Sequence, residues 1–394
     1  MSSQRRESDR SCCTWPRILF LVVLLAVAGI CIWKFVPWED TINDVLDQVP
    51  IPGGDSDSIT NNNNDGNEAT PDLIETASPS SPLMYEFIQC NDNGQTSGDC
   101  CNGLEGICDL RADEILYATI HNGMSTFEDG FLFGPNHKYQ LEAALQAGYR
   151  GLNLDLCNCG GETIFCHGIC TLGPRDVVDV MQNVNTFLNE NPSEVIIFIY
   201  QVNDDVDQQV DLNLFYDKLL QVDGLVDKMY VHDDPANPWP TLRELTDPGF
   251  DKRIIMFHYN GPDCNNDPSA CPDGLHVYYN YASDNNWSYN NVASIQNRTN
   301  SCELRSNGIN RNTFVGLNNF VSPPSQNSAQ ILNGYSDAND YVNTCSSMIG
   351  ADINFLLVDY WSEGELPRFT QDHNTARALQ RRGRKLLQTD PLQE

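Results

Sequence analysis

The chain of 394 residues is poor in positive charge: it carries 23 Lys and Arg side chains against 54 Asp and Glu side chains, so its net charge is -31 at pH 7. A surface with this excess of acid repels nucleic acid and anionic lipid headgroups. The composition therefore excludes non-specific binding to polyanions, and no nucleic-acid partner is expected. An anionic substrate must be held by a local arrangement of residues against the field of the whole chain.

Sequence motifs of two common enzyme classes are also missing. No G-x-G-x-x-G motif follows the first expected strand, which argues against a dinucleotide-binding fold. No G-x-S-x-G motif is present, so the chain offers no signature of a serine nucleophile of the hydrolase type. The sequence thus points away from nicotinamide-dependent dehydrogenases and from serine hydrolases.

Long apolar runs are scarce, and the clearest one covers residues 18–38, interrupted by a single charged side chain, Lys34. This length matches the about 20 residues that span a bilayer, and arginines precede the run while acidic residues follow it. We expect a cytosolic tail at 1–17, a transmembrane signal anchor at 18–38 and a single-pass type II membrane protein whose main domain is extracellular or lumenal. The alternative is a signal peptide cleaved near Ala26-Val27-Ala28, which would give a secreted protein.

Cysteine is plentiful after this run, with 12 of the 15 cysteines between Cys90 and Cys345. An even number in an exported chain predicts disulfides. The stretch CNCGGETIFCHGIC at 157–170 combines cysteines with His167, so a structural zinc site is the alternative there. Two sequons predict glycosylation at Asn286 and Asn297.

The rest of the chain divides by composition. Residues 39–85 are polar, acidic and rich in Asn, Ser, Gly and Pro, which predicts a disordered stalk. Residues 86–375 alternate strand and helix patterns, which predicts one α/β domain, a TIM-type (β/α) barrel of regular or irregular form; a doubly wound open sheet is the alternative. Residues 376–394 form a basic tail that is expected to be exposed.

The elements expected in the α/β domain are short apolar runs and amphipathic segments. The helical patterns cover 137–148 and 175–192. The strand patterns cover 114–120, 150–156, 162–166, 194–202, 252–259, 312–321 and 354–361.

Polar side chains stand at the ends of several expected strands. His121 and Asn122 follow the first, Asp155 closes the second, His167 follows the third and Asp359 closes the last. In a barrel these ends meet at one mouth, and the last strand lies beside the first. Imidazoles titrate near neutrality, so two of them there suit general acid–base catalysis, with Asp359 holding His121 in the useful tautomer. The alternative is that both histidines are structural.

Five segments occur in order: ATIHNGMS, GYRGLNLDL, FCHGIC, NPSEVIIFIY and LLVDYWSEGELP. Through them, residues 110–375 resemble the X-domain superfamily of phosphatidylinositol-specific phospholipases C, above all the exported PLC-like phosphodiesterases of plants, fungi and protists. The resemblance implies a TIM-type barrel and cleavage of a phosphodiester by the inositol 2-hydroxyl. It implies that His121 activates this hydroxyl, that His167 protonates the leaving alkoxide and that Asp359 orients His121.

The resemblance also bears on metal and substrate binding. Asn122 and Asp155 match calcium ligands of the calcium-dependent branch, whereas Asn153 replaces an acidic residue and Tyr200 replaces a glutamate. The metal-independent bacterial branch has an arginine where this chain has Asp155. Because carboxylates set calcium affinity, we expect at most a weak calcium site on Asn122, Asn153 and Asp155. Arg150 and Tyr200 are the candidates for substrate binding, although Arg150 begins a strand and suits a structural ion pair.

Together these features predict a phosphoric diester hydrolase of the phospholipase C type, acting on a phospholipid or a related phosphodiester. The alternative is a catalytically impaired barrel that serves as a cell-surface binding or adhesion module, which Asn153 and Tyr200 favour. A secreted glycerophosphodiesterase would share the barrel and the histidines, but it needs a glutamate-rich metal site that the sequence does not contain.

Overall fold

The computed structural model describes residues 100–168, 170–202, 210–259, 271–305 and 313–389. The expected cytosolic tail at 1–17, signal anchor at 18–38 and stalk at 39–85 lie outside the described residues. Within the described ranges, no helix combines the length and the apolar character that crossing a membrane requires.

The centre of the domain is a nine-stranded sheet in which every strand but one is parallel to its neighbours. The parallel strands are β3 (Tyr117–Ile120), β4 (Gly151–Cys159), β6 (Ile196–Val202), β7 (Ile254–Tyr259), β8 (Leu275–Val277), β9 (Ala282–Asp284), β10 (Phe314–Asn318) and β11 (Phe355–Val358). The exception is β5 (Glu162–Cys166), which forms an antiparallel hairpin with β4. A separate small hairpin joins β1 (Cys100–Cys101) and β2 (Leu104–Glu105).

The parallel strands follow one another around a curled sheet in the order β8-β7-β6-β4-β3-β11-β10-β9. The last strand, β11, pairs with the first, β3, as expected for a barrel. The two outer strands, β8 and β9, are consecutive in the chain and are joined by the short helix α8 (Tyr278–Tyr281), and no ladder between them is found in the described residues. The fold is therefore a TIM-like α/β arrangement opened at this point. The doubly wound alternative is wrong because the strand order does not reverse.

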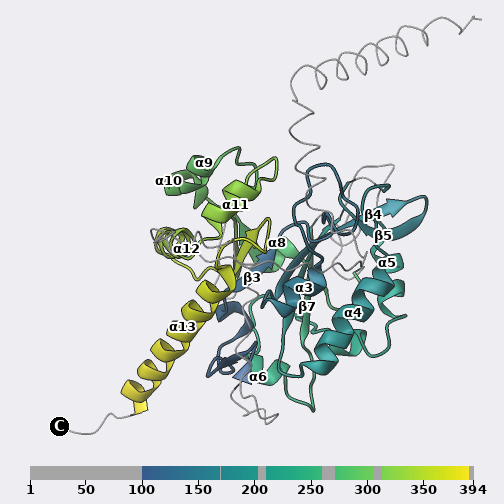
Figure 1. The fold of residues 1–394 in the computed structure, drawn as a ribbon. Helices are drawn as coiled ribbons and strands as arrows, with labels where there is room; N and C mark the ends of the chain where they lie inside the picture. Colours follow the sequence, from purple (N-terminus) through teal and green to yellow (C-terminus); the bar gives the residue numbers. More distant parts are fainter. Residues whose placement is uncertain (1–99, 169, 203–209, 260–270, 306–312, 390–394) are drawn as a thin grey trace, which may run out of the picture. The chain divides into compact units, whose positions relative to one another are not determined.

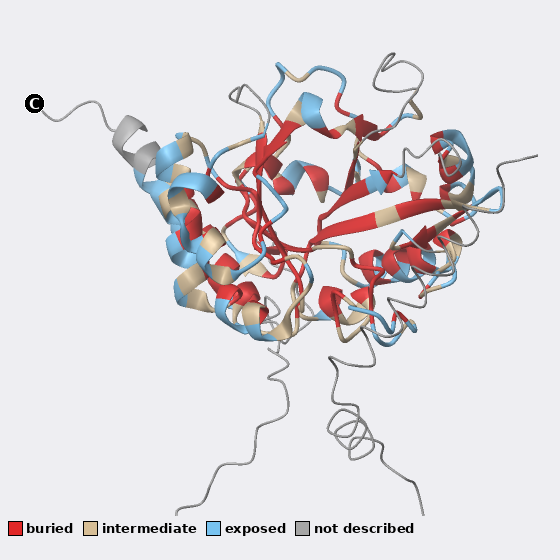
Figure 2. Ribbon diagram, turned by 90° about the horizontal axis from the view of Figure 1, so that it is seen from above, coloured by how far each residue is buried: buried red, intermediate tan, exposed pale blue. Residues whose placement is uncertain are grey.

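Helices cover the outside of the sheet. They are α3 (Leu141–Gln146), α4 (Val177–Glu190), α5 (Leu212–Leu219), α6 (Leu242–Leu245), α9 (Val292–Gln296), α10 (Arg298–Ser301), α11 (Gln326–Leu332), α12 (Tyr335–Ile349) and α13 (Leu366–Thr389), with 3-10 turns η1 (Ala112–Glu114) and η2 (Val226–Lys228). Figure 1 shows α4 and α5 side by side and α9 to α12 gathered together. The strands are almost wholly buried, whereas the helices are buried along one side (Figure 2).

Helix α4 shows how the sequence produces this layer. The Asp176 side chain caps its first turn by accepting from the backbone N–H groups of Val178 and Asp179. Its apolar side chains recur at helical spacing and are buried against the sheet. The helix ends at Glu190, shortly before Pro192, because the residue before a proline disfavours the helical conformation.

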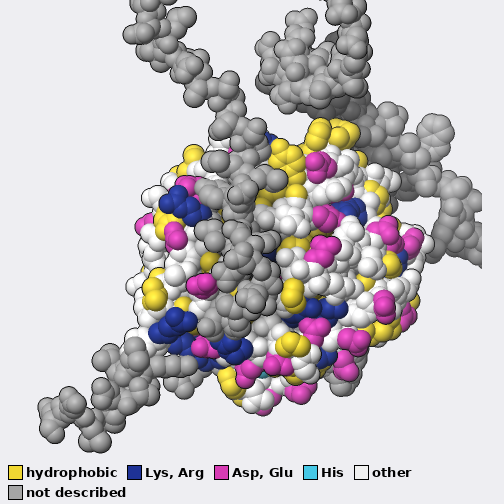
Figure 3. Space-filling model, turned by 60° about the horizontal axis from the view of Figure 1, so that its bottom comes forward, with side chains coloured by type: hydrophobic (Ala, Val, Ile, Leu, Met, Phe, Trp, Pro, Cys, Tyr) yellow, Lys and Arg dark blue, Asp and Glu magenta, His cyan; other side chains and the backbone are white. Residues whose placement is uncertain are grey.

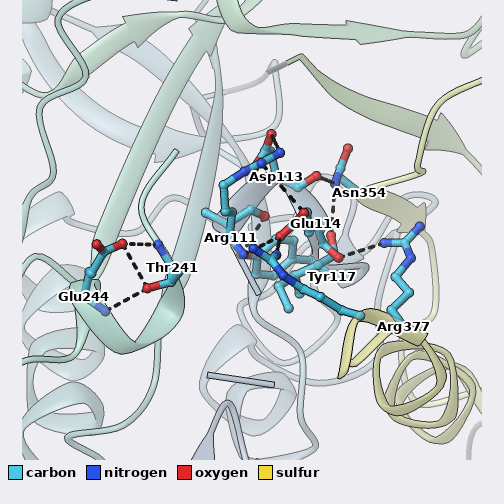
Figure 4. A network of polar contacts seen from close by, with 11 residues as sticks. Arg111, Asp113, Glu114, Tyr117, Thr241, Glu244, Asn354 and Arg377 are labelled. Atoms are coloured by element: carbon cyan, nitrogen blue, oxygen red, sulfur yellow. Dashed lines mark hydrogen bonds and ion pairs between the residues drawn. The ribbon is translucent and has the colours of Figure 1, made fainter. Parts of the chain in front are cut away.

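A polar network fastens the helix α13 to the amino-terminal ends of the strands (Figure 4). Arg111 pairs with Asp113 through two hydrogen bonds of 2.8 and 3.0 Å. Asn354 donates to the Asp113 carbonyl at 2.8 Å, and Arg377 of α13 donates to the Glu114 carbonyl at 3.1 Å. The boundary expected between 375 and 376 therefore falls inside a docked helix, and the first part of the expected tail packs against the domain.

Charges of both signs share the surface. On the face seen in Figure 3, Lys and Arg side chains stand among Asp and Glu side chains, with apolar side chains between them. The acidic excess of the composition is thus partly offset at short range on that face.

Candidate active site

A cavity of about 590 Å³ opens at the carboxyl-terminal ends of the strands. This is the end at which parallel barrels place their functional loops. The sequence singled out six polar side chains that line it: His121, Asn122, Asn153, Asp155, His167 and Asp359. The fold therefore brings together the five residues that strand-end placement predicted and Asn153, which the family resemblance had added.

His121 and Asp359 form the central pair of this cavity. His121 follows β3 and Asp359 follows β11, and because these strands are neighbours the His121 Nδ1 atom lies 2.9 Å from Asp359 Oδ1. The imidazole also stacks on the Phe320 ring at 3.6 Å between centroids. With Nδ1 held by a buried carboxylate, Nε2 is the nitrogen available for proton transfer.

Two residues that the sequence did not single out support this pair. Asn136 is buried and donates from Nδ2 to Asp359 Oδ1 at 2.7 Å. His137 donates from Nε2 to the His121 carbonyl at 2.6 Å, and burial lowers the pKa of His137 to about 4, so it is neutral at pH 7. Both lie in the loop between β3 and α3. The helical pattern expected at 137–148 includes His137, but α3 begins only at Leu141, so only the tertiary structure reveals the positions of these two side chains.

His167 reaches the cavity by a different route from the expected one. The strand before it, β5, is the return strand of a hairpin rather than a barrel strand, and Cys166 pairs with Asp155 of β4. Because β4 runs on past the mouth to Cys159, the returning chain carries His167 back to the level of the cavity. The expected position was correct, but the reason given for it was wrong.

Two disulfides hold this hairpin. Cys157 is bonded to Cys166, and Cys159 is bonded to Cys170, so one bridge ends next to His167 and the other just beyond it. The zinc alternative for this stretch is therefore wrong. All ten cysteines in the described part of the chain are in disulfides, as the export hypothesis predicts.

Burial shifts the proton affinity of two groups here. It lowers the pKa of His167 to about 4, with a further lowering from the nearby His121. Burial raises the pKa of Asp155 to about 7. His167 Nε2 lies 2.8 Å from Asn122 Nδ2, and the Phe131 ring packs beside the imidazole at 5.2 Å between centroids. Two titratable groups with displaced pKa values in one cavity are typical of an active site.

The residues expected to bind calcium also converge. Asn153 accepts from the Asn122 backbone N–H at 3.1 Å and donates to the Ile199 carbonyl at 3.0 Å, while Asp155 Oδ1 is buried without a hydrogen-bond partner. The residue of β6 that lines the cavity is Gln201, which pairs in register with Asp155. Among the described residues, no group of three or more His, Cys, Asp or Glu side chains could hold a metal ion.

The two candidates for substrate binding lie elsewhere. Arg150 is buried at the start of β4, where its Nε donates to Glu194 Oε2 at 2.6 Å, so the structural ion pair is confirmed and substrate binding is wrong. Tyr200 is fully buried between the sheet and the helices, with its hydroxyl near the sulfur atoms of Met181 and Met256. Side chains alternate along a strand, so Tyr200 points outward where Gln201 points inward.

The sequon residues Asn286 and Asn297 are both exposed, as glycosylation requires. They line a surface hollow of about 820 Å³ that includes neither His121 nor His167 but shares Arg305 with the cavity described above. Glycosylation at these two positions stays a prediction.

Comparison with known proteins found one matching family and one curated relative. The family model described as PI-PLC X 1 matches residues 107–374. A curated relative, the PI-PLC X domain-containing protein 1 of Arthroderma benhamiae, is 30% identical over 190 residues, which are 47% of this chain. The chain spans 59% of the length of that relative.

Solved structures of the phosphatidylinositol-specific phospholipase C of Staphylococcus aureus are also similar. The structure of a point mutant of that enzyme is 12% identical, with a TM-score of 0.45 over 67% of this chain and 93% of that chain. A structure from a study of that enzyme's membrane binding is 13% identical, with a TM-score of 0.47 over 67% of this chain and 94% of that chain.

Proposed function

Since the chain belongs to the PI-PLC X family, we propose that it is a phosphoric diester hydrolase of the phospholipase C type that uses histidine acid–base catalysis. The observation that carries this proposal is the cavity in which His121, held by Asp359, and His167 both present imidazoles. Such a pair can serve a phosphate placed between them, one nitrogen removing a proton and the other supplying one.

In the proposed reaction, His121 Nε2 takes the proton of the attacking hydroxyl, which belongs to the substrate headgroup or to water. The hydroxyl oxygen forms a new bond to phosphorus, and the bond from phosphorus to the leaving alkoxide breaks. His167 gives its proton to that alkoxide, and Asp359 stabilises the His121 imidazolium. His167 must first be protonated, and the negative charge of the bound phosphate favours this by raising its pKa above the value of about 4 in the free protein.

Exposed apolar side chains near the cavity are an argument for a lipid substrate. The loop between β3 and α3 exposes Phe127, Leu132 and Phe133, with 61%, 59% and 76% of their surfaces accessible. Phe131 of the same loop packs against His167, so these side chains stand next to the site. Trp287, which lines the cavity, is 52% exposed. Exposed apolar side chains around a catalytic mouth suit a substrate embedded in a membrane.

A calcium ion is the cofactor proposed for this site. Asn122, Asp155 and Gln201 would hold it, with Asn153 beside them, and the unpartnered oxygen of Asp155 fits a cation ligand. The ion would offset negative charge on the phosphate. With one carboxylate in the set, its affinity would be weak. A rise in melting temperature at millimolar calcium that is lost in Asp155→Asn would support the proposal, and identical melting curves would contradict it.

The test of the function is replacement of the two histidines. His121→Ala and His167→Ala should each lower kcat on a panel of phosphodiesters by about 10²- to 10⁴-fold. His373→Gln is the matched control, because His373 lies on α13 and packs on Phe369 away from the cavity. Undiminished activity in His121→Ala would remove the proposed catalytic pair.

The second candidate function is a non-catalytic surface binding or adhesion module. It is favoured by Asn153, an amide where the calcium-dependent relatives carry an acid. Wild-type protein that turns over no member of the panel, with or without calcium, would support this alternative. In either case we propose an exported location for the domain, which its disulfides favour.

A further inference from the structure

Acidic side chains outnumber Lys and Arg side chains among the residues that line the cavity. Three carboxylates line it, from Asp155, Asp284 and Asp359. The only Lys or Arg among the described residues that line it is Arg305. A bound phosphodiester adds a further negative charge, which a guanidinium in the cavity wall attracts.

Arg305 is held in place by Asp284, the last residue of β9. Its Nε donates to Asp284 Oδ1 at 3.1 Å and its Nη2 donates to Asp284 Oδ2 at 2.5 Å. Asp284 is 1% exposed, and the Tyr259 hydroxyl also donates to its Oδ2 at 2.9 Å. The backbone N–H of Arg305 donates to the Asp284 carbonyl at 2.7 Å, which fixes the main chain as well.

In this arrangement one edge of the Arg305 guanidinium, formed by Nε and Nη2, donates hydrogen bonds to Asp284, and the opposite edge does not. An arginine side chain has five N–H groups, and Asp284 accepts from two of them. Among the described residues, none accepts a hydrogen bond from Nη1, while the side chain is 34% exposed and lines the cavity. A planar pair of N–H donors matches the oxygens of a phosphate group.

We propose that Arg305 is the anion-binding residue of this cavity, that it binds non-bridging oxygens of a phosphate group on the substrate, and that Asp284 is its positioning residue. The inference rests on the proposed function for the kind of substrate. The phosphate is either the one that is cleaved or a second one on the headgroup, since both present the same oxygens.

The alternative hypothesis is that the Arg305–Asp284 ion pair has a structural role only, and it predicts a different result. In that case Arg305 would only neutralise the buried Asp284, so its loss would lower the melting temperature and leave phosphate binding unchanged. The two cases separate through a ligand measurement rather than through stability.

The first experiment is calorimetric titration of the folded protein with inorganic phosphate. Arg305→Ala should raise the dissociation constant about tenfold or more, and Arg305→Lys should raise it less, because lysine keeps the charge but loses the fork. Arg298→Ala is the matched control: Arg298 pairs with Asp337 and Asp340 on α12, outside the cavity, and should leave the constant unchanged. An unchanged constant in both Arg305 variants, or no phosphate binding by the wild type, would overturn the proposal.

The second experiment finds which phosphate Arg305 contacts. Turnover of phosphatidylinositol and of a phosphatidylinositol monophosphate is compared in the wild type and in Arg305→Lys. An equal loss of kcat/KM on both substrates assigns the cleaved phosphate, and a loss on the monophosphate alone assigns the second one. No loss on either substrate contradicts the proposal. Phosphate binding through Arg305 in a protein without turnover would contradict the proposed function and leave this inference standing.

Discussion

At the scale of single residues, Asp359 is the side chain that holds His121 in the cavity. Its Oδ1 atom accepts hydrogen bonds from His121 Nδ1 and from the Asn136 side-chain amide, and the carboxylate is almost fully buried. A buried carboxylate in this position fixes the ring and the tautomer of a catalytic imidazole, because it offers an acceptor to one nitrogen alone.

We therefore predict that Asp359→Asn lowers kcat by about 10²-fold or more, because an amide can present a donor to Nδ1 and favour the wrong tautomer. Asn136→Ala should have a smaller effect in the same direction, since the carboxylate itself remains. The measurement is kcat as a function of pH, with melting temperatures as the check on folding. Wild-type kcat in Asp359→Asn would show that His121 works without this partner.

At the scale of elements, the β4–β5 hairpin is the part of the fold that delivers His167. Its two disulfides close loops of 9 and 11 residues in sequence separation, and the histidine stands between the two bridge ends Cys166 and Cys170. The bridge between Cys302 and Cys345, with a separation of 43, lies elsewhere and holds α10 near α12. Loss of a hairpin bridge should therefore affect both activity and stability, whereas loss of the Cys302–Cys345 bridge should affect stability alone.

Replacing Cys159 and Cys170 together by Ser should lower kcat about tenfold or more, because the hairpin tip no longer fixes the imidazole, and should cost about 3 kcal/mol of stability from the lost cross-link. Replacing Cys302 and Cys345 by Ser should cost about 4 kcal/mol, since the closed loop is longer, with kcat of the remaining folded protein unchanged. Chemical unfolding and steady-state kinetics measure both. An equal loss of kcat in the two double variants would contradict the role of the hairpin.

The loop between β3 and α3 is the second element with a functional consequence. Leu132→Ser together with Phe133→Ser should weaken binding to phosphatidylcholine vesicles about tenfold or more, because each buried apolar side chain contributes about 1.5–3 kcal/mol to membrane binding. Turnover of a water-soluble phosphodiester should not change. Leu379→Ser is the control, being 62% exposed on α13 at the other end of the strands. Vesicle sedimentation that does not distinguish the two variants would exclude the loop from membrane contact.

At the scale of the whole molecule, buried neutral histidines couple stability to pH. Burial lowers the pKa to about 4 for five of the seven, namely His137, His167, His258, His276 and His373. Their ordinary pKa is 6.5, so between pH 6.5 and 4 the unfolded chain binds protons that the folded chain does not. The free energy of unfolding therefore falls as the pH falls through this window.

Asp155 acts in the opposite direction, because its pKa of about 7 exceeds its ordinary value of 3.8 and the folded state gains a proton first. One such group offsets the five histidines only in part. We predict that the melting temperature, followed by circular dichroism without reductant, drops steadily from pH 7 to pH 4. His373→Gln should make this drop shallower. A melting temperature that stays level over this range would mean that these histidines take up protons in the folded chain as readily as in the unfolded one.

The sequence by itself determined the strand–helix alternation, the even set of cysteines and the strand-end positions of His121 and Asp359, because periodicity and chain order are local properties. Asp155 was expected to close a strand, but it lies within β4, which runs on to Cys159. Tertiary structure alone decided that β5 turns back as a hairpin, that Tyr200 faces the helices while Gln201 faces the cavity, and that Asn136 and Arg305 join the site. Those outcomes depend on pairing register and on contacts between residues distant in the chain. A one-residue change of register reverses the facing of a strand, and no local pattern in these segments fixes it.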